Sequence, residues 1–394
     1  MKPARRGACP SLAAPMPTGD GLLVRLSPLD RRLSAPALKG LARAAARLGN
    51  GVVEITSRGS LQLRGFTETS AAALADIVAG LDLAVTTGVT VDTGPLAGLD
   101  PAEIADPRPL AANLRRALAG SGRRFAPKAS VVVDGGGRLP LDQLACDVRL
   151  KAAGGGWTCD GAVVADPVGC VMDRLASPGR RLADTVRPAA EVIGTHGLRG
   201  GLFALGIGLP FGQVSAAALE TLASPSAAEF RLAPGRALLV VGLAAADLPL
   251  WKQTARAAGF IVEPGDPRRS VAACPGCPAC AAGEIPAREM AGEIAGSTAA
   301  LLDGSLTVHV SGCAKGCAHP GRALLSLTGV DGACELAMGG VPLARMRPRA
   351  AIRALADLAR LVAERRSGGE TAAACLERLG GDRVGARLRD RLHA

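Results

Sequence analysis

The chain has 394 residues, too many for one ordinary hydrophobic core, so we expect two or more domains or a duplicated unit. Hydrophobic residues make up 48% and charged residues 21%, which excludes a disordered chain, and no apolar run is long enough to span a bilayer. The net charge is +11, but aromatic residues are only 2%, which argues against a protein that stacks single-stranded nucleic acid on aromatic rings.

The beginning of the chain is basic and lacks the apolar segment of a secretion signal, so we expect a cytoplasmic protein. Eleven cysteines in a reducing compartment are not expected to form disulfides, and a dense group of them indicates metal binding.

The first predicted elements form a strand–helix–strand–strand unit. The helix has Ser34 as its N-cap and Pro36 in its first turn, and Gly49 and Gly51 end it. The strands are apolar or alternate between apolar and polar residues. The unit consists of a strand at 22–26, a helix at 35–48, and strands at 52–55 and 61–63, and it closes at Gly65-Phe66.

A second unit of the same order begins near Gly200. It has a strand at 202–209, a helix at 215–222, and strands at 229–232 and 237–241. We therefore predict an α+β fold built by duplication, in which two half-domains pair across a pseudo-two-fold axis with a site between them. The alternative is a chance similarity between two α+β stretches.

A longer α/β segment follows each unit, and only the second segment carries a dense cysteine group. The first has a helix at 110–118 and a strand at 129–133, and the second has a helix at 287–302 and a strand at 306–310. The tail is predicted to form two amphipathic helices rich in Arg and Glu that cover the surface. The expected domains are 14–75, 76–190, 197–246, 247–348 and a helical tail at 349–394.

Five thiols lie in two short stretches of the second segment. A-C-P-G-C-P-A-C holds Cys274, Cys277 and Cys280, and after 32 intervening residues S-G-C-A-K-G-C-A-H-P holds Cys313 and Cys317. Zinc and a 4Fe-4S cluster both take four thiolates. Zinc sites typically use pairs two residues apart, so the gap of three residues between Cys313 and Cys317 favours the cluster. The remaining cysteines are scattered and are predicted to be small buried hydrophobes: Cys9, Cys146, Cys159, Cys170, Cys334 and Cys375.

The spacing of Cys274, Cys280, Cys313 and Cys317 resembles the cluster pattern of sulfite and nitrite reductases. The resemblance implies duplicated ferredoxin-like half-domains, each with an α/β domain, and a 4Fe-4S cluster beside sirohaem. I-T-S-R-G-S-L-Q-L-R-G, with Arg58, looks like their strand that offers an Arg to the macrocycle, and F-A-P-K-A-S-V-V-V, with Lys128, looks like their basic substrate-side strand. The weaker candidates for holding substrate carboxylates are Arg64, Arg123 and Arg124.

Within this superfamily, R-R-G-A-C-P-S-L, P-M-P-T-G-D-G-L-L-V-R-L and G-C-A-K-G-C-A-H-P resemble the precorrin-3B synthases of aerobic cobalamin synthesis. The chain departs from the reductases at Ser130, where they carry a second Lys, and at residues 89–93, where an expected Arg is missing. These departures put sulfite or nitrite as the substrate in doubt and fit a protein whose substrate is a tetrapyrrole. Cys277 has no ligand role in the family.

The family resemblance implies an oxygen-dependent hydroxylation of precorrin-3A at the meso carbon between rings A and D, with γ-lactone formation, to give precorrin-3B. It also implies a mononuclear non-haem iron and an external, NADH-derived electron donor, because the chain shows no dinucleotide fingerprint of its own. His319, two residues after Cys317, is the candidate iron ligand. The other interpretation is that His319 hydrogen-bonds a loop carbonyl and that His309 lies on one face of a strand.

Two other functions remain open from the sequence. The first is a sirohaem-dependent sulfite or nitrite reductase, which an absorption spectrum would reveal. The second is a zinc-stabilised, basic nucleic-acid-binding protein, which metal analysis would reveal. The leading prediction includes neither a nucleic-acid partner nor a membrane.

Overall fold

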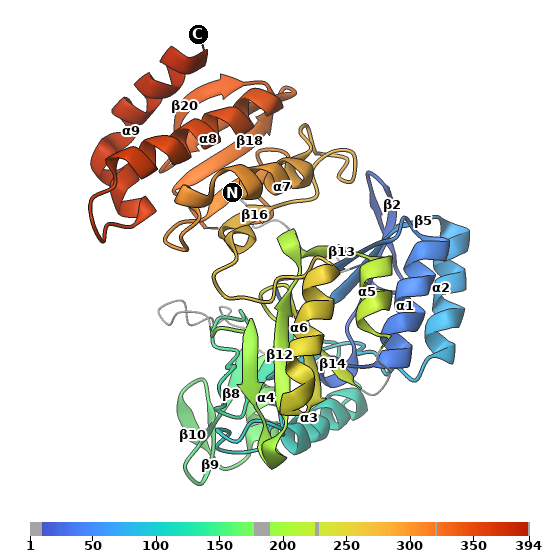
Figure 1. The fold of residues 1–394 in the computed structure, drawn as a ribbon. Coiled ribbons are helices and arrows are strands. Elements are labelled where there is room, and N and C mark those ends of the chain that lie inside the picture. Colours follow the sequence, from blue (N-terminus) through green and yellow to red (C-terminus); the bar gives the residue numbers. More distant parts are fainter. Residues whose placement is uncertain (1–9, 177–189, 225–227, 320, 393–394) are drawn as a thin grey trace. The chain divides into compact units, whose positions relative to one another are not determined.

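The computed structural model describes residues 10–176, 190–224, 228–319 and 321–392 (Figure 1). By internal contacts the chain divides into two units. One contains residues through Met16 together with Leu22–Pro264, and the other contains Pro17–Gly21 together with Gly265–Ala394. Cys9 and most of the opening stretch lie outside the described residues.

The first unit contains both half-domains, and they share the same order of elements. The first half runs β2 (Gly21–Leu26), η1 (Leu29–Arg31), β3 (Arg32–Ser34), α1 (Ala35–Leu48), β4 (Val52–Ile55), β5 (Leu61–Phe66) and α2 (Glu68–Gly80). The second runs β12 (Phe203–Gly208), η3 (Pro210–Gly212), β13 (Gln213–Ser215), α5 (Ala216–Leu222), β14 (Glu229–Ala233), β15 (Ala237–Leu243), η4 (Ala245–Asp247) and α6 (Leu248–Ala257). The predicted strand–helix–strand–strand order is confirmed in both.

Each half-domain gives one short strand to the sheet of the other. One five-stranded sheet contains the consecutive strands β2–β5–β4–β13, and the other runs β11 (Gly194–Gly197)–β12–β15–β14–β3. β13 pairs antiparallel with β4, and β3 pairs antiparallel with β14. A single hydrophobic core then spans both halves, because its buried residues come from 24–78 and from 205–262. The pairing predicted from the duplication is therefore made by exchanged strands, and helices α1, α2 and α5 lie side by side (Figure 1).

Local sequence explains the helix starts. Ser34 Oγ accepts a hydrogen bond from the Ala37 N–H and Ser215 Oγ accepts one from the Ala218 N–H, both at 3.2 Å. At the end of α1, the Gly49 N–H donates a hydrogen bond to the Ala45 carbonyl oxygen. These caps sit at matching places in the two halves.

The two α/β segments also have the same topology. The first sheet runs β6 (Thr90–Thr93), β7 (Ser130–Asp134), β8 (Val148–Ala153), β9 (Gly156–Cys159) and β10 (Ala162–Val164), with helices α3 (Arg108–Gly120) and α4 (Pro167–Ala176). The second runs β16 (Val271–Ala273), β17 (Val308–Ser311), β18 (Leu325–Val330), β19 (Ala333–Met338) and β20 (Val341–Met346), with α7 (Ala287–Ser297) and α8 (Pro348–Arg365). In each sheet the first two pairings are parallel and the last two antiparallel.

Three short 3₁₀ segments, η2 (Arg199–Gly201), η5 (Pro267–Ser270) and η6 (Ala299–Leu301), and strand β1 (Met16–Thr18) complete the connections. The helix predicted at 287–302 ends earlier, at Ser297, and its last residues form η6 instead. The tail forms α8 and α9 (Ala372–Leu392), and α8 buries Leu355, Leu358 and Val362. No helix in the described part of the chain is both long and apolar enough to cross a membrane.

Candidate functional site

The predicted cluster cysteines lie in two loops of the second unit that follow parallel strands. Cys274, Cys277 and Cys280 follow β16, and Cys313 and Cys317 follow β17, its parallel neighbour. Because both loops leave the carboxyl ends of adjacent parallel strands, they meet at the same edge of the sheet. Cys274 is buried, Cys277, Cys280 and Cys313 are half-buried, and Cys317 is exposed.

Hydrogen bonds donated by backbone N–H groups join the two loops. The Gly312 N–H donates to Cys274 Sγ at 3.0 Å, and the Glu284 N–H donates to the Gly312 carbonyl oxygen at 2.7 Å. Within the loops, the Cys280 N–H donates to the Gly276 carbonyl oxygen at 2.8 Å, and Ser311 Oγ donates to the Cys313 carbonyl oxygen at 2.6 Å. N–H donation to a cluster sulfur is a usual way for a protein to stabilise the thiolate.

Gly312 allows the close approach of these loops. A Cβ at this position would lie 2.9 Å from Gly276 Cα and 3.4 Å from Cys274 Sγ. The segment Pro17–Gly21 packs on the same loops, because a Cβ at Gly19 would lie 2.4 Å from the Pro278 carbonyl oxygen. Nothing in the sequence indicated that residues 17–20, P-T-G-D, contact the cysteine loops.

The Cys317 thiol lies within electrostatic reach of three of the other four thiols in these loops. Burial is the main cause that raises the pKa of the Cys317 thiol. The next causes are the charges at Cys274, Cys313 and Cys280, whereas Cys277 is not among them. Yet no three His, Cys, Asp or Glu side chains of the described residues are gathered closely enough to hold a single metal ion.

His309 and His319 lie together beside the second cysteine loop. His309 is on β17 and is 7% exposed, and its ring centroid lies 5.8 Å from that of His319. Within the described residues these rings belong to no three-ligand set. The described part of the chain therefore offers no three-ligand site for a mononuclear iron.

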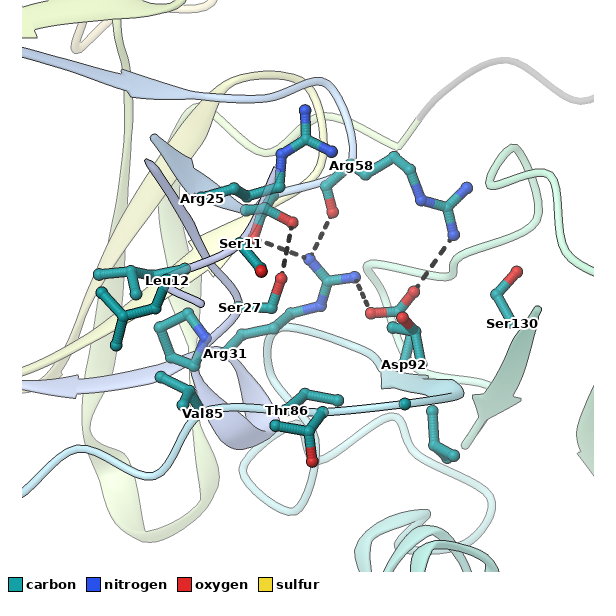
Figure 2. Close-up of a pocket in the computed structure, with 18 of the residues that line it drawn as sticks. Ser11, Leu12, Arg25, Ser27, Arg31, Arg58, Val85, Thr86, Asp92 and Ser130 are labelled. Carbon is teal, nitrogen blue, oxygen red and sulfur yellow. Dashed lines mark hydrogen bonds and ion pairs between the residues drawn. The ribbon is translucent and has the colours of Figure 1, made fainter. Parts of the chain in front are cut away.

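The predicted substrate residues Arg58 and Lys128 both line one cavity in the first unit. Figure 2 shows Arg58 in this cavity. It has a volume of about 630 Å³, within the range of small-molecule and cofactor pockets. Arg58 lies in the turn between β4 and β5 and Lys128 in the turn before β7, so neither is in the strand expected for it. Arg123 and Arg124 are exposed and Arg64 is buried in an ion pair with Glu54 at 3.5 Å; none of these three lines the cavity.

Sequence reasoning missed two further arginines of this cavity, Arg25 and Arg31. Arg25 on β2 donates through Nη2 to Gln62 Oε1 at 2.6 Å. Arg31 donates through Nη2 to Asp92 Oδ1 at 2.7 Å, and Arg58 Nη2 donates to the other oxygen, Oδ2, at 3.3 Å (Figure 2). The cavity is therefore cationic although residues 89–93 and Ser130 supply no cation.

Of the scattered cysteines in the described residues, four are buried as predicted, whereas Cys170 is only half-buried. Cys146, Cys334 and Cys375 are 0% exposed and Cys159 is 1% exposed. Burial raises the pKa of Cys334 to about 11, which keeps it a neutral thiol. The described cysteines form no disulfide.

Comparison with known proteins identifies the class of protein to which this fold and these cysteine loops belong. The model of the nitrite/sulfite reductase ferredoxin-like half domain matches residues 14–81. The structure of the Mycobacterium tuberculosis NirA protein is similar with a TM-score of 0.67 and 18% identity, covering 92% of this chain and 84% of that one. The chain thus has the nitrite/sulfite reductase-like fold, and the predicted α+β duplicated fold class is confirmed.

A precorrin-3B synthase from Sinorhizobium sp is 40% identical over 432 residues, covering 97% of this chain and 94% of the relative. The chain belongs to the precorrin-3B synthase family. The resemblance read from the sequence is confirmed.

Proposed function

We propose that this protein is a cytoplasmic monooxygenase of corrin synthesis that hydroxylates precorrin-3A at the meso carbon between rings A and D, closes a γ-lactone and gives precorrin-3B. The observation that carries the proposal is the match to a precorrin-3B synthase over nearly the whole of both chains. The cavity supports it, because arginines that line a pocket of about 630 Å³ suit a macrocycle bearing several carboxylates.

Cys274, Cys280, Cys313 and Cys317 would hold a 4Fe-4S cluster, which supplies single-electron transfer when bound. The Gly312 N–H would stabilise the Cys274 thiolate, and burial of Cys274 would limit access of water to that sulfur. Arg58 and Lys128 would pair with substrate carboxylates. Dioxygen would be the oxidant and an external, NADH-derived chain the electron donor.

The test begins with protein purified without oxygen. We expect iron and acid-labile sulfide in the ratio of a 4Fe-4S cluster, no extractable sirohaem, and conversion of precorrin-3A to a product heavier by one oxygen atom that carries label from ¹⁸O₂. Stoichiometric sirohaem with sulfite-dependent electron consumption would instead establish a reductase. Zinc in place of iron would establish the zinc-stabilised alternative.

A pair of neighbouring cysteines tests the ligand set. Cys280→Ala should lose the cluster and lower solubility, because thiolate ligation contributes to folding. Cys277→Ala, three residues earlier in the same loop, should keep the iron and sulfide content of the wild type. Loss of the cluster in Cys277→Ala together with its retention in Cys280→Ala would show that the ligand set is wrong.

A further inference from the structure

Arg31 occupies a backbone position that its counterpart in the other half-domain fills with glycine. η1 and η3 occupy the same place in the two halves, which sets Asp30 opposite Phe211 and Arg31 opposite Gly212. All four have positive φ: 51° and 62° at Asp30 and Arg31, 53° and 80° at Phe211 and Gly212. A non-glycine residue is strained in this region, so its presence at a pocket suggests a function for the side chain.

The Arg31 side chain is buried and fully engaged. Its residue is 5% exposed, and Nε donates to the Thr93 carbonyl oxygen at 3.2 Å. Nη1 donates to the carbonyl oxygens of Arg58 at 2.6 Å and Gly59 at 3.4 Å. Arg31 therefore ties the β4–β5 turn, which carries Arg58, to the end of β6, which carries Asp92 (Figure 2).

Asp92 divides its two oxygens between two guanidinium groups. Oδ1 accepts from Arg31 at 2.7 Å and Oδ2 accepts from Arg58 at 3.3 Å. Arg58 is further fixed by donating through Nη1 to the Ala145 carbonyl oxygen at 2.7 Å. Two guanidinium groups and one carboxylate leave an excess of one positive charge, and Arg58, with 36% of its side chain exposed, is the more accessible of the two cations.

We propose that Arg31, Asp92 and Arg58 form a charge-sharing triad that binds one carboxylate of the substrate, with Arg31 as the positioning residue. This inference rests on the proposed tetrapyrrole substrate. Arg31 binds one of the two carboxylate oxygens of Asp92 and balances its negative charge. The positive charge of Arg58 therefore remains available to the ligand. Without Arg31, Asp92 would pair with Arg58 alone, and the remaining pair would carry no net charge.

Variants that change and then restore the net charge of the triad can distinguish this role of Arg31 from a purely structural one. Arg31→Met removes the cation, and adding Asp92→Asn to it removes the carboxylate that would then neutralise Arg58. The probe is uroporphyrin III, a stable tetrapyrrole octacarboxylate, titrated into the full-length protein and followed by its fluorescence at low and high salt. Arg231→Met is the matched control, since Arg231 is also buried and donates to backbone carbonyls, of Pro95 and Ala97, but does not line the cavity.

We expect Arg31→Met to weaken uroporphyrin binding about tenfold at low salt, the effect of one charge-assisted contact. The Arg31→Met/Asp92→Asn double variant should recover most of the wild-type affinity, and the difference between the variants should shrink at high salt because screening weakens it. Arg231→Met should lower the melting temperature without a comparable loss of affinity.

A double variant that binds as weakly as Arg31→Met would overturn the triad, and so would unchanged affinity in Arg31→Met or no binding of the probe by the wild-type protein. The test is independent of turnover. If the wild-type protein binds the probe with this charge pattern but does not hydroxylate precorrin-3A, the proposed reaction fails and the triad stands.

Discussion

The two cysteine loops approach each other closely at Gly312, so a single methyl group there should disturb both. In Gly312→Ala the new Cβ would meet Gly276 Cα at 2.9 Å, which the backbone must relieve by moving. We expect the iron and sulfide content of the purified variant to fall well below that of the wild type. Gly296→Ala is the control, since a Cβ at Gly296 on α7 meets nothing within 4 Å and alanine favours a helix. Equal cluster content in the two variants would contradict this role.

Glu103 makes the stability of the first unit depend on pH. Burial is the main cause that raises its pKa to about 7 from 4.5, against the opposing hydrogen bond from the Gly98 N–H at 2.8 Å. Between about pH 4.5 and 7 the folded protein retains a proton that the unfolded chain releases, so the free energy of unfolding falls as the pH rises through this window. Above pH 7 this loss is complete.

Glu103→Gln keeps a carbonyl oxygen for the Gly98 N–H but removes the charge. We expect the free energy of unfolding of this variant to exceed that of the wild type by up to about 1 kcal/mol at pH 8 and by little at pH 4.5. The difference is modest because solvent partly screens a half-buried group. Urea unfolding at the two pH values measures the difference. Glu263→Gln, at an exposed ion pair with Arg256, is the control, and an equal pH-dependent gain there would refute the assignment to Glu103.

At the same scale, the sequence predicted some site residues and could not predict others. Arg58 and Lys128 were recognisable because each lies in a stretch that resembles the family. Arg31 looked like one of two adjacent arginines, and its burial depends on carbonyls of Arg58, Gly59 and Thr93 that are 27–62 residues away. The only local signal is the alignment of P-L-D-R-R-L-S with L-P-F-G-Q-V-S, which sets Arg31 opposite Gly212.

At the scale of elements, the exchanged strands hold the two halves together. β3 has only three residues, yet Leu33 is 1% exposed and is paired in register with Phe230 of the other half. Leu33→Ala should lower the free energy of unfolding by about 2–5 kcal/mol, the usual cost of a cavity in a core. Denaturant unfolding followed by circular dichroism measures it.

Leu250→Ala, at a residue of α6 that is 63% exposed, is the control and should change stability by less than about 0.5 kcal/mol. If Leu33→Ala cost no more than this control, the exchanged strand would not stabilise the core.

The elements found from sequence were those whose own residues specify them. β4 at Val52–Ile55 was predicted with the bounds that it has, and α1 and α5 start at serine caps that the sequence displays. β3 and β13 were missed because a three-residue strand with one buried side chain has no periodicity, and its partner is in the other half. β20 contains Pro342, which weakens the strand signal.

At the scale of the whole molecule, duplication extends beyond the half-domains. The two α/β sheets share one strand order and one pattern of parallel and antiparallel pairing, but only the second carries a group of five cysteines in the loops after its first two strands. The matching loops of the first sheet hold a single buried cysteine, Cys146. The sequence revealed the repeated half-domains through matching lengths of strand and helix. It could not reveal the repeated sheets, because β8–β10 and β18–β20 differ in length and residue type and are recognisable only by their pairing.

The division of the chain into two units predicts two separate unfolding transitions. The cysteine loops belong to one unit and the cationic cavity to the other, and each unit has its own internal contacts. A ligand stabilises only the part of a protein whose folded form binds it. In anaerobic scanning calorimetry we therefore expect two transitions: chelation of iron should lower one, and uroporphyrin III should raise the other. Cys280→Ala should reproduce the effect of chelation, whereas Arg58→Ala should abolish only the effect of uroporphyrin. A single transition that both treatments shift would mean that the two units unfold as one.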